Sequence, residues 1–269
     1  MVDAPAVRAG EASPSGDTGF RFTAGPAGRI LRCAALEPLA DHLFTTRQLE
    51  LRGETIASDY ARIGEAFATS GDNVVRVRQV HGRTVLRVAP GSRWDTPPDA
   101  DAIVSVDPEQ VISVRVADCV PILVADRAGR AVAVVHAGWR GAAAGLIAAT
   151  IDAIQELAVP AADLVASVGP AIGPCCYQVD EPVRSQFEAA MPGSDVWFTA
   201  DGARWRLDLW TAASDQLVSA GVPTAAIHLA RQCTAHHPDD WFSHRREGAG
   251  TGRMVAAIRL PGSRHAPPR

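Results

Sequence analysis

The sequence lacks the features that mark several large classes of protein. It contains no uninterrupted apolar run of the roughly 18 residues that a membrane-spanning helix requires, so we expect no membrane association. Positive charge is not in excess, because 26 Lys and Arg face 30 Asp and Glu for a formal net charge of -4. Composition therefore indicates no general attraction to nucleic acid, and the expected partner is a small molecule.

Cysteine is scarce, and its spacing forms no recognisable framework. There are five cysteines, an odd number: Cys33, Cys119, Cys175, Cys176 and Cys233. No CxxC pair occurs, and the adjacent Cys175 and Cys176 are poorly placed to bond each other. These features favour a reducing compartment, so we expect a cytoplasmic location.

The two ends of the chain differ in composition from its interior. Residues 1–19 are rich in Ala, Pro, Gly and Ser without the apolar core of a secretory signal, and Pro, Arg and His dominate 263–269. We expect both segments to be disordered tails. Residues 20–262 contain no repeat of fixed period and no long linker, which predicts a single domain.

Hydrophobic periodicity predicts an α/β protein. Strands are expected over residues 29–36, 42–47, 73–80, 84–88, 101–106, 111–117, 121–126, 131–138, 163–169, 225–230 and 252–260. Helices are expected over residues 58–68, 139–157, 182–190 and 208–220. This order of elements favours one domain with a mixed sheet, or two sheets covered by helices.

Three residues capable of chemistry lie where an apolar strand gives way to a turn: His81, Cys119 and His136. Such positions can converge at one edge of a sheet, and a thiol with two imidazoles forms a three-ligand zinc set that leaves the fourth position open. The alternative is a buried, inert Cys119 with both imidazoles satisfied by the backbone. Asp118 has three readings: it orients a ligand His, pairs with a substrate donor, or forms a turn.

The stretch VVHAGWRG joins a predicted strand to a predicted helix through glycines that flank Trp139 and Arg140. A strand end, a glycine turn and a helix N-terminus place His136, Trp139, Arg140 and free backbone N–H groups around one concavity, which suits an anion or a sugar phosphate. The alternative is a tight turn that leaves Arg140 in solvent.

Two polar loops complete the candidate site. GPAIGPCCYQVDEPV carries Tyr177 and the cysteine pair, and we expect it to form a pocket wall in which the thiols are structural. CTAHHPDDWFSHRREGAGTGRM gathers imidazoles, arginines and glycines, among them Arg245. This second loop is interpreted either as a phosphate or substrate clamp or as a solvated loop with exposed cations.

Taken in order, QVHG, VADC, VVHAGWRG, GPAIGPCCYQV and FSHRREGAGTGRM resemble the laccase-domain proteins, also called multicopper polyphenol oxidase-like, over about residues 41–260. The resemblance implies an α/β/β/α sandwich with mixed sheets, related to the cysteine hydrolases of the cytotoxic necrotising factor type. It also implies zinc at a His, Cys, His site, which falls on His81, Cys119 and His136.

The resemblance further implies a purine nucleoside enzyme of the phosphorylase type, acting on adenosine, inosine, guanosine or methylthioadenosine by phosphorolysis or deamination. Its partners would be nucleoside and phosphate, and the chain would be a monomer or small homo-oligomer. The expected site has these members: His81, Cys119, His136 and Asp118 in catalysis, and Arg47, Trp139, Arg140 and Arg245 on substrate or phosphate. A Cys-His amide hydrolase or peptidoglycan-precursor editing enzyme is the second reading, and a non-catalytic zinc-stabilised binding protein the third.

The chain departs from the family pattern in two respects, and each limits which family properties can be expected here. The family's glycine-rich segment after FTTR is shortened and altered here over residues 44–70, so only Arg47 is transferred from it and substrate choice stays open. Multicopper oxidation needs two sites fed by many histidines, typically in HxH pairs, whereas this chain has eight histidines and no HxH. Zinc is therefore favoured over copper.

Overall fold

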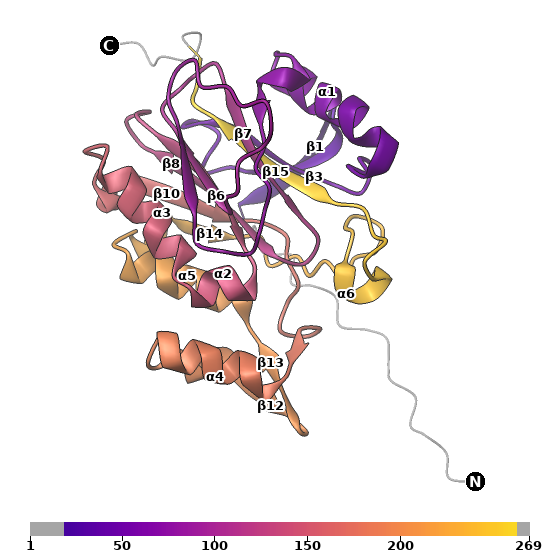
Figure 1. The fold of residues 1–269 in the computed structure, drawn as a ribbon, viewed down its shortest axis with the longest axis vertical. Coiled ribbons are helices and arrows are strands. Elements are labelled where there is room, and N and C mark those ends of the chain that lie inside the picture. The colour runs from indigo at the N-terminus through magenta and orange to yellow at the C-terminus, as the bar shows by residue number, and fades with distance from the viewer. Residues whose placement is uncertain (1–18, 263–269) are drawn as a thin grey trace.

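The computed structural model describes residues 19–262, so the tails predicted over 1–18 and 263–269 lie outside the described residues. Two six-stranded mixed sheets pack face to face, and helices cover their outer faces (Figure 1). This arrangement confirms the α/β class with mixed sheets. The limits of the single domain predicted over 20–262 stay a prediction.

The first sheet contains, in spatial order, β1 (Phe20–Gly25), β2 (Gly28–Cys33), β3 (Asp41–Thr45), β15 (Met254–Arg259), β7 (Val111–Val116) and β4 (Val74–Val75). Neighbouring strands are antiparallel except β4 and β7, which are parallel. Helix α1 (Ile56–Ala66) lies on its outer face, where Tyr60 and Ile63 join a buried apolar cluster with Leu43 and Val255.

The second sheet contains, in spatial order, β14 (Ile227–Leu229), β10 (Leu164–Val168), β8 (Val120–Asp126), β9 (Val132–Ala137), β6 (Ala102–Ser105) and β5 (Val85–Val88). Only its two outermost pairs, β10 with β14 and β5 with β6, are parallel. Its outer face is covered by α2 (Trp139–Ala143), α3 (Leu146–Gln155) and α5 (Leu209–Ser219).

A smaller unit lies beside the sandwich (Figure 1). It consists of α4 (Glu181–Ala190) and a three-stranded sheet of β11 (Gln178–Val179), β13 (Arg204–Leu207) and β12 (Phe198–Asp201). The remaining described helices are α6 (His244–Glu247) and the 3-10 turns η1 (Gly53–Thr55), η2 (Gly71–Asn73), η3 (Ala161–Asp163), η4 (Ser194–Trp197) and η5 (Thr224–Ala226). No helix within residues 19–262 is long and apolar enough to cross a membrane.

Strand alternation divides the core into layers and sets the direction of the site residues. In β9, Val132 and Val134 pack between the sheets, whereas Ala133 and Val135 pack under the helices. Successive side chains on a strand point to opposite faces, so His136 shares the face of Val132 and Val134. This histidine therefore projects from the end of β9 at the inter-sheet layer.

Two predictions about elements are wrong. The strand predicted over 73–80 reduces to Val74–Val75, because the chain then leaves the sheet and only Arg78 forms an isolated bridge, with Asp99. The helix predicted over 139–157 is divided, because Gly145 adopts a left-handed φ of 82° between α2 and α3. Strand β1 and the small sheet were not predicted.

Candidate active site

The three residues singled out in the sequence lie together at the end of strand β9, where His136 is the penultimate residue. The ligand atoms of His81, Cys119 and His136, called here the His–Cys–His triad, all lie within 4.8 Å of one another. The Cys119 Sγ is 3.9 Å from the His81 Nε2, and the two imidazole rings meet edge to face at 4.8 Å between centroids. Exposure increases from His136, which is buried, through Cys119 to His81, so the triad has an open side.

Asp101, which precedes β6, holds both histidines in place. Its Oδ1 lies 2.8 Å from the His136 Nδ1, and that side chain is fully buried. The same carboxylate accepts hydrogen bonds from three successive backbone N–H groups, those of Val80, His81 and Gly82. Asp101 therefore fixes the tautomer of His136, leaving its Nε2 for the site. Sequence reasoning missed this residue, because an acidic side chain at a strand start resembles a turn former.

Close approach explains the glycines of HAGWRG. His81 has a left-handed φ of 60°, a conformation that costs energy for a non-glycine residue and that the hydrogen bonds to Asp101 stabilise. The turn it forms presses on the next segment: a Cβ on Gly138 would lie 3.0 Å from both the Cys119 Sγ and the His81 Cδ2. A Cβ on Gly141 would lie 2.9 Å from the Gly82 carbonyl oxygen. A side chain at Gly141 would thus require the backbone to move, and one at Gly138 would require Cys119 and His81 to shift.

The electrostatics of the triad favour a thiolate beside an imidazolium. Burial opposes ionisation of Cys119, but the charge and hydrogen bonding of His136, assisted by His81, lower the pKa of the thiol to about 6. Burial likewise opposes charging of His136, yet Cys119 and Asp101 raise its pKa to about 9. Near neutral pH the site thus holds a negative sulfur, a positive imidazole and the Asp101 carboxylate, whose own pKa is lowered by His136 despite burial.

The donor atoms of the triad fit a zinc ion. Zn–S and Zn–N bonds of about 2.3 and 2.1 Å place neighbouring donors of a tetrahedral site roughly 3.4–3.8 Å apart. The 3.9 Å separation of the Cys119 and His81 donor atoms is close to that range. A carboxylate on the far nitrogen of a ligand histidine is the usual support of such a site, and Asp101 supplies it for His136. Three ligands leave a fourth position open.

The Asp118 carboxylate makes its hydrogen bonds to two loops, not to a histidine, which differs from the His-orienting role that was one of the three expected for it. Its Oδ1 accepts a hydrogen bond from the Thr234 hydroxyl at 2.6 Å, and its Oδ2 accepts one from the backbone N–H of Arg245 at 2.6 Å. Its backbone has a left-handed φ of 88°. Asp118 thus ties the turn before Cys119 to two loops, and the carboxylate that contacts His136 is Asp101.

Arg245 and Arg140 each lie over an aromatic ring, and both influence the pKa of Tyr177. The Arg245 guanidinium lies over the Tyr177 ring, 5.2 Å from its centroid, and Arg140 lies over the ring of Trp139 at 4.4 Å. Burial raises the pKa of Tyr177, and the charge on Cys119 raises it further. Arg245 and Arg140 act in the opposite direction on the same hydroxyl. The Tyr177 hydroxyl thus lies in the field of the triad and of both arginines.

Arg47 and Arg253 differ in their partners. Arg47 is paired with Glu247 at 3.3 Å and lies over the Phe242 ring at 4.7 Å, so its charge is already matched. Burial lowers the pKa of Arg253, Arg115 lowers it further, and Cys119 opposes the shift. Arg253 is therefore a half-buried cation within the field of Cys119, and sequence reasoning did not single it out.

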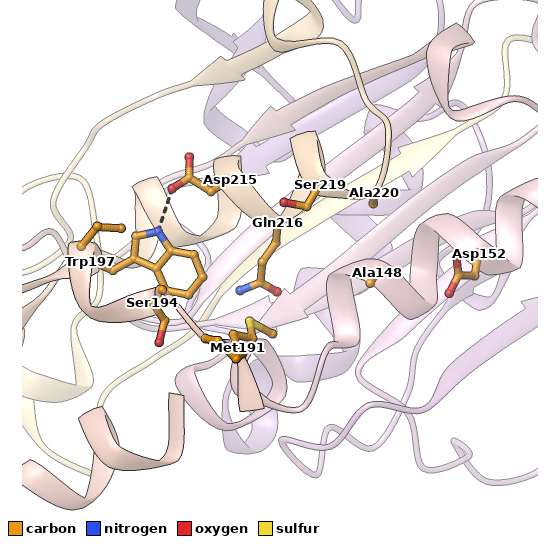
Figure 2. A pocket seen from close by; sticks show the side chains of 12 residues that line it. Ala148, Asp152, Met191, Ser194, Trp197, Asp215, Gln216, Ser219 and Ala220 are labelled. Carbon is orange, nitrogen blue, oxygen red and sulfur yellow. Dashed lines mark hydrogen bonds between the residues drawn. The ribbon is translucent and has the colours of Figure 1, made fainter. Parts of the chain in front are cut away.

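A separate pocket of about 530 Å³ lies between α3, α5 and the segment 191–197 (Figure 2). Its wall includes Gln216 and the pair formed by the Trp197 Nε1 and the Asp215 carboxylate, 2.7 Å apart. None of its lining residues belongs to the triad. This pocket is therefore distinct from the residues with perturbed pKa values.

Comparison with known proteins gives consistent matches. A family model described as multi-copper polyphenol oxidoreductase laccase matches residues 44–261. The purine nucleoside phosphorylase YlmD of Geobacillus stearothermophilus is 32% identical over 213 residues, covering 76% of this chain and 78% of that protein. The purine nucleoside phosphorylase YfiH of Escherichia coli is 36% identical over 186 residues, covering 69% and 73%.

Solved structures show the same fold. The crystal structure of a Bacillus licheniformis hypothetical protein YfiH superposes with a TM-score of 0.82 at 28% identity, covering 89% of this chain and 99% of that one. The crystal structure of YlmD from Geobacillus stearothermophilus gives a TM-score of 0.81 at 29% identity, covering 87% and 96%.

Proposed function

Since this chain belongs to the laccase-domain family, described as multi-copper polyphenol oxidoreductase laccase, we propose that it cleaves purine nucleosides by phosphorolysis at the His–Cys–His triad. The observation that carries the proposal is the convergence of His81, Cys119 and His136, with an open side, in a chain whose relatives bear that enzyme name. Membership also confirms the family resemblance that the motifs carry.

In phosphorolysis, a phosphate oxygen bonds to the anomeric carbon while the bond to the purine nitrogen breaks. The bonding electrons leave with the purine, which must take up a proton or accept a strong hydrogen bond. His136 is a buried imidazolium whose charge is stabilised by Asp101, so it is suited to supply that proton through its Nε2. His81, at the exposed side of the triad, is the residue through which the proton would exchange with solvent.

Phosphate needs cations that are not already paired with carboxylates. Arg253 is half-buried within the field of Cys119, and the charges of Arg245 and Arg140 both act on the Tyr177 hydroxyl. We assign phosphate to these three guanidiniums, because arginine binds phosphate oxygens in a bidentate manner. Arg47 takes a lesser part in this proposal, since it is paired with Glu247. The half-buried rings of Trp139 and Tyr177 are the surfaces available to the purine.

The same three residues, His81, Cys119 and His136, would hold zinc in the metal-bound form of the protein. The His136 Nε2 would then be a metal ligand, so the proton-donor role proposed for His136 belongs to the metal-free triad. When bound, zinc supplies a Lewis acid and lowers the pKa of a coordinated water, which is the chemistry that deamination of adenosine would use. Asp101 would keep the His136 Nδ1 protonated and the Nε2 directed at the metal. Whether the bound nucleoside reacts with phosphate or with water would then depend on the residues around the site.

The test incubates the purified protein with inosine or adenosine, with and without phosphate, and separates free base, ribose phosphate and deaminated nucleoside by chromatography. We expect phosphate-dependent formation of base and ribose phosphate. An Arg253→Gln variant should raise the KM for phosphate by about tenfold, the cost of one charge-assisted hydrogen bond, with a smaller effect on the KM for nucleoside. If deaminated nucleoside forms without phosphate, the reaction is hydrolytic deamination and the proposed phosphorolysis is wrong. The absence of any product would also contradict the proposal.

A second candidate is a Cys-His amide hydrolase. The observation that favours it is the order Cys119, His136, Asp101, in which a thiolate, an imidazolium and an orienting carboxylate follow one another as in Cys-His proteases. The proposed relation to cysteine hydrolases of the cytotoxic necrotising factor type, and editing of peptidoglycan precursors, belong to this alternative. Mass spectrometry after incubation with a peptide substrate would detect an acyl group on Cys119, and a nucleoside phosphorylase would show none.

A further inference from the structure

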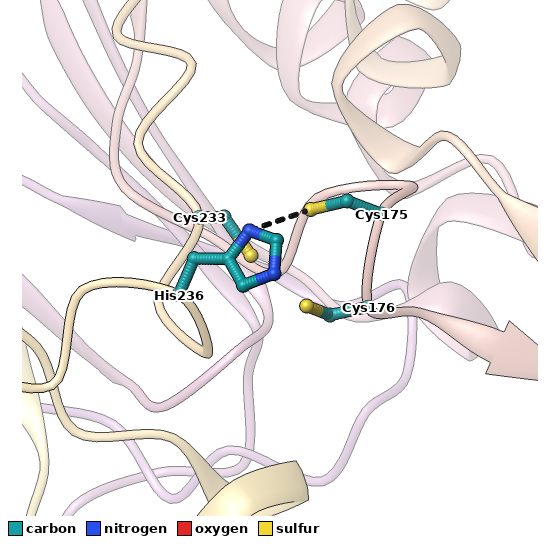
Figure 3. A group of neighbouring side chains, drawn as sticks. All are labelled: Cys175, Cys176, Cys233 and His236. Atoms are coloured by element: carbon teal, nitrogen blue, oxygen red, sulfur yellow. Dashed lines mark hydrogen bonds between the residues drawn. The ribbon is translucent and has the colours of Figure 1, made fainter. Parts of the chain in front are cut away.

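A second group of thiols and an imidazole lies outside the His–Cys–His triad. The ligand atoms of Cys175, Cys176, Cys233 and His236, called here the four-ligand cluster, all lie within 4.8 Å of one another. Figure 3 shows the three sulfur atoms and the ring converging from two loops, with the Cys175 Sγ 3.4 Å from the His236 Nδ1. The proposed phosphorolysis uses none of these four side chains.

Main-chain hydrogen bonds bring the two loops together. Ala171 and Cys233 form an isolated parallel bridge, in which the Thr234 N–H donates to the Ala171 carbonyl at 3.1 Å. The backbone N–H groups of Cys176 and Tyr177 both donate to the Gly173 carbonyl, so the chain turns back at the cysteine pair. The four donor side chains are therefore presented by a framework that does not itself depend on them.

Two features of the framework are specific to the sulfur atoms. The Gly173 N–H donates to the Cys233 Sγ at 3.3 Å, and a donor on the sulfur stabilises a thiolate. A Cβ on Gly173 would lie 2.5 Å from the Trp210 ring, so only glycine lets this N–H approach. The His236 N–H donates to the Cys233 carbonyl at 3.1 Å, which turns the imidazole back toward the sulfur three residues earlier.

The donor set has the composition of a structural zinc site. Three thiolates and one imidazole complete a tetrahedron without an open position, and such closed Cys3His sites stabilise folds rather than catalyse reactions. The 3.4 Å between the Cys175 and His236 donors equals the spacing expected for neighbouring ligands of tetrahedral zinc, roughly 3.4–3.8 Å. Thiolate sulfur also disfavours magnesium and calcium, which take oxygen ligands.

We propose that Cys175, Cys176, Cys233 and His236 bind a second zinc ion, which clips the loop 170–177 to the loop 231–237. Each bound cysteine loses its proton to solvent, so formation of the three Zn–S bonds releases three protons.

The two loops joined by the proposed zinc ion also bind Asp118, the residue that precedes Cys119. Thr234 follows Cys233 and donates to the Asp118 carboxylate at 2.6 Å, and the Ile172 N–H donates to the Asp118 carbonyl at 3.0 Å. Both clipped loops therefore hold the turn that carries Cys119 into the triad.

The test counts metal in protein purified under reducing conditions, stripped with a chelator and reloaded with Zn²⁺. We expect about two equivalents of zinc in the unmodified chain and about one in Cys175→Ser and in His236→Ala, both of which change exposed side chains. His237→Ala is the matched control, because it removes the neighbouring imidazole, which lies outside the cluster. Cys119→Ala should lose the other equivalent, so failure at one site is distinguished from failure at the other.

Cobalt identifies the ligands independently of activity. Co²⁺ bound to three thiolates gives an intense sulfur-to-metal charge-transfer band, which should survive in Cys119→Ala and weaken strongly in Cys175→Ser. Zinc loading should also raise the Tm of the unmodified chain more than that of His236→Ala. The proposal would be overturned if the unmodified chain bound only one equivalent of zinc and lost it in Cys119→Ala. It would also be overturned if, under reducing conditions, the cluster cysteines formed a disulfide instead of binding metal.

Discussion

The His–Cys–His triad and the four-ligand cluster use the same side chains and differ in what surrounds them. In the triad, one thiol lies between two imidazoles, and the positive charge of His136 lowers the pKa of Cys119 to about 6. In the cluster, burial and the neighbouring thiol of Cys233 raise the pKa of Cys175 to about 12, and that of Cys176 is raised as well. The triad stabilises its own thiolate, whereas the cluster requires an external cation.

Their supports differ in the same way. The triad depends on a buried carboxylate, Asp101, which orients one histidine and holds the backbone of the other. The cluster depends on backbone hydrogen bonds between two loops, and its fourth ligand closes the coordination sphere. Ligand number and local charge, rather than residue type, thus separate a site suited to chemistry from one suited to stability.

Removal of the triad thiol tests this separation most severely. Cys119→Ala takes away the sulfur that charges His136, and we expect kcat/KM for phosphorolysis to fall by more than about 10³-fold, the scale seen when a catalytic centre loses a member. Cys33→Ala, which removes a buried thiol elsewhere, is the control and should leave turnover in place. Activity retained in Cys119→Ala would remove the thiol from the mechanism and erase the distinction between the two regions.

Asp101→Asn tests the carboxylate that holds the triad histidines in place, which has no counterpart among the backbone contacts on which the four-ligand cluster depends. The amide still fits the cavity but carries no charge and cannot accept all four hydrogen bonds in the same way, so the triad should lose about 10–100-fold in zinc affinity. Competition with a chelator in a His236→Ala background measures the triad site alone. Asp99→Asn, an exposed carboxylate two residues earlier, serves as the control. Equal affinities in the two variants would show that Asp101 only shapes the backbone.

The sequence predicted individual strands best where they are buried on both faces, while the layered sandwich was implied by the family resemblance. Val132 to Val135 form a continuous apolar run that reads directly as a strand covered on either side. Val74 to Arg78 also has the pattern of a strand, yet the strand ends at Val75 and the chain bends away. The local sequence does not show where a neighbouring strand ends, so it could not predict this bend. The small sheet of β11, β12 and β13 was missed since its strands are short and only partly buried.

The triad could be predicted from local pattern, and its surroundings could not. His81, Cys119 and His136 each stand at the end of an apolar, strand-like stretch of sequence, so one rule singled out all three, and the family resemblance pointed to the same residues. Asp101 acts through contacts that span 35 residues to His136. The pairing of Cys175 with His236 spans 61 residues, and such contacts are fixed only by the folded chain.

Alkylation compares the two kinds of thiol without any substitution. In metal-free protein, the thiolate fraction of Cys119 should rise about tenfold between pH 5 and pH 7, because its pKa of about 6 lies between them. Cys175 is more exposed but should react slowly throughout, since its pKa of about 12 keeps it protonated. Mass spectrometry of iodoacetamide-labelled peptides measures both rates in one sample. Faster labelling of Cys175 than of Cys119 at pH 7 would reverse the assignment, and denatured protein should show no difference.

Gly138→Ala makes the smallest change, a single methyl group placed against the triad. The added carbon would lie 3.0 Å from the Cys119 Sγ and from the His81 Cδ2, so these atoms must separate by a few tenths of an ångström. Overpacking of this kind costs about 1 kcal/mol or more, which corresponds to roughly fivefold in zinc affinity at the triad. The four-ligand cluster should be unaffected, because neither atom belongs to it. Gly25→Ala, where the new Cβ meets nothing within 4 Å, gives the baseline. If chelator competition finds both variants equal to the unmodified chain, the triad is loose enough to absorb a methyl group, and its geometry is less fixed than the hydrogen bonds to Asp101 imply.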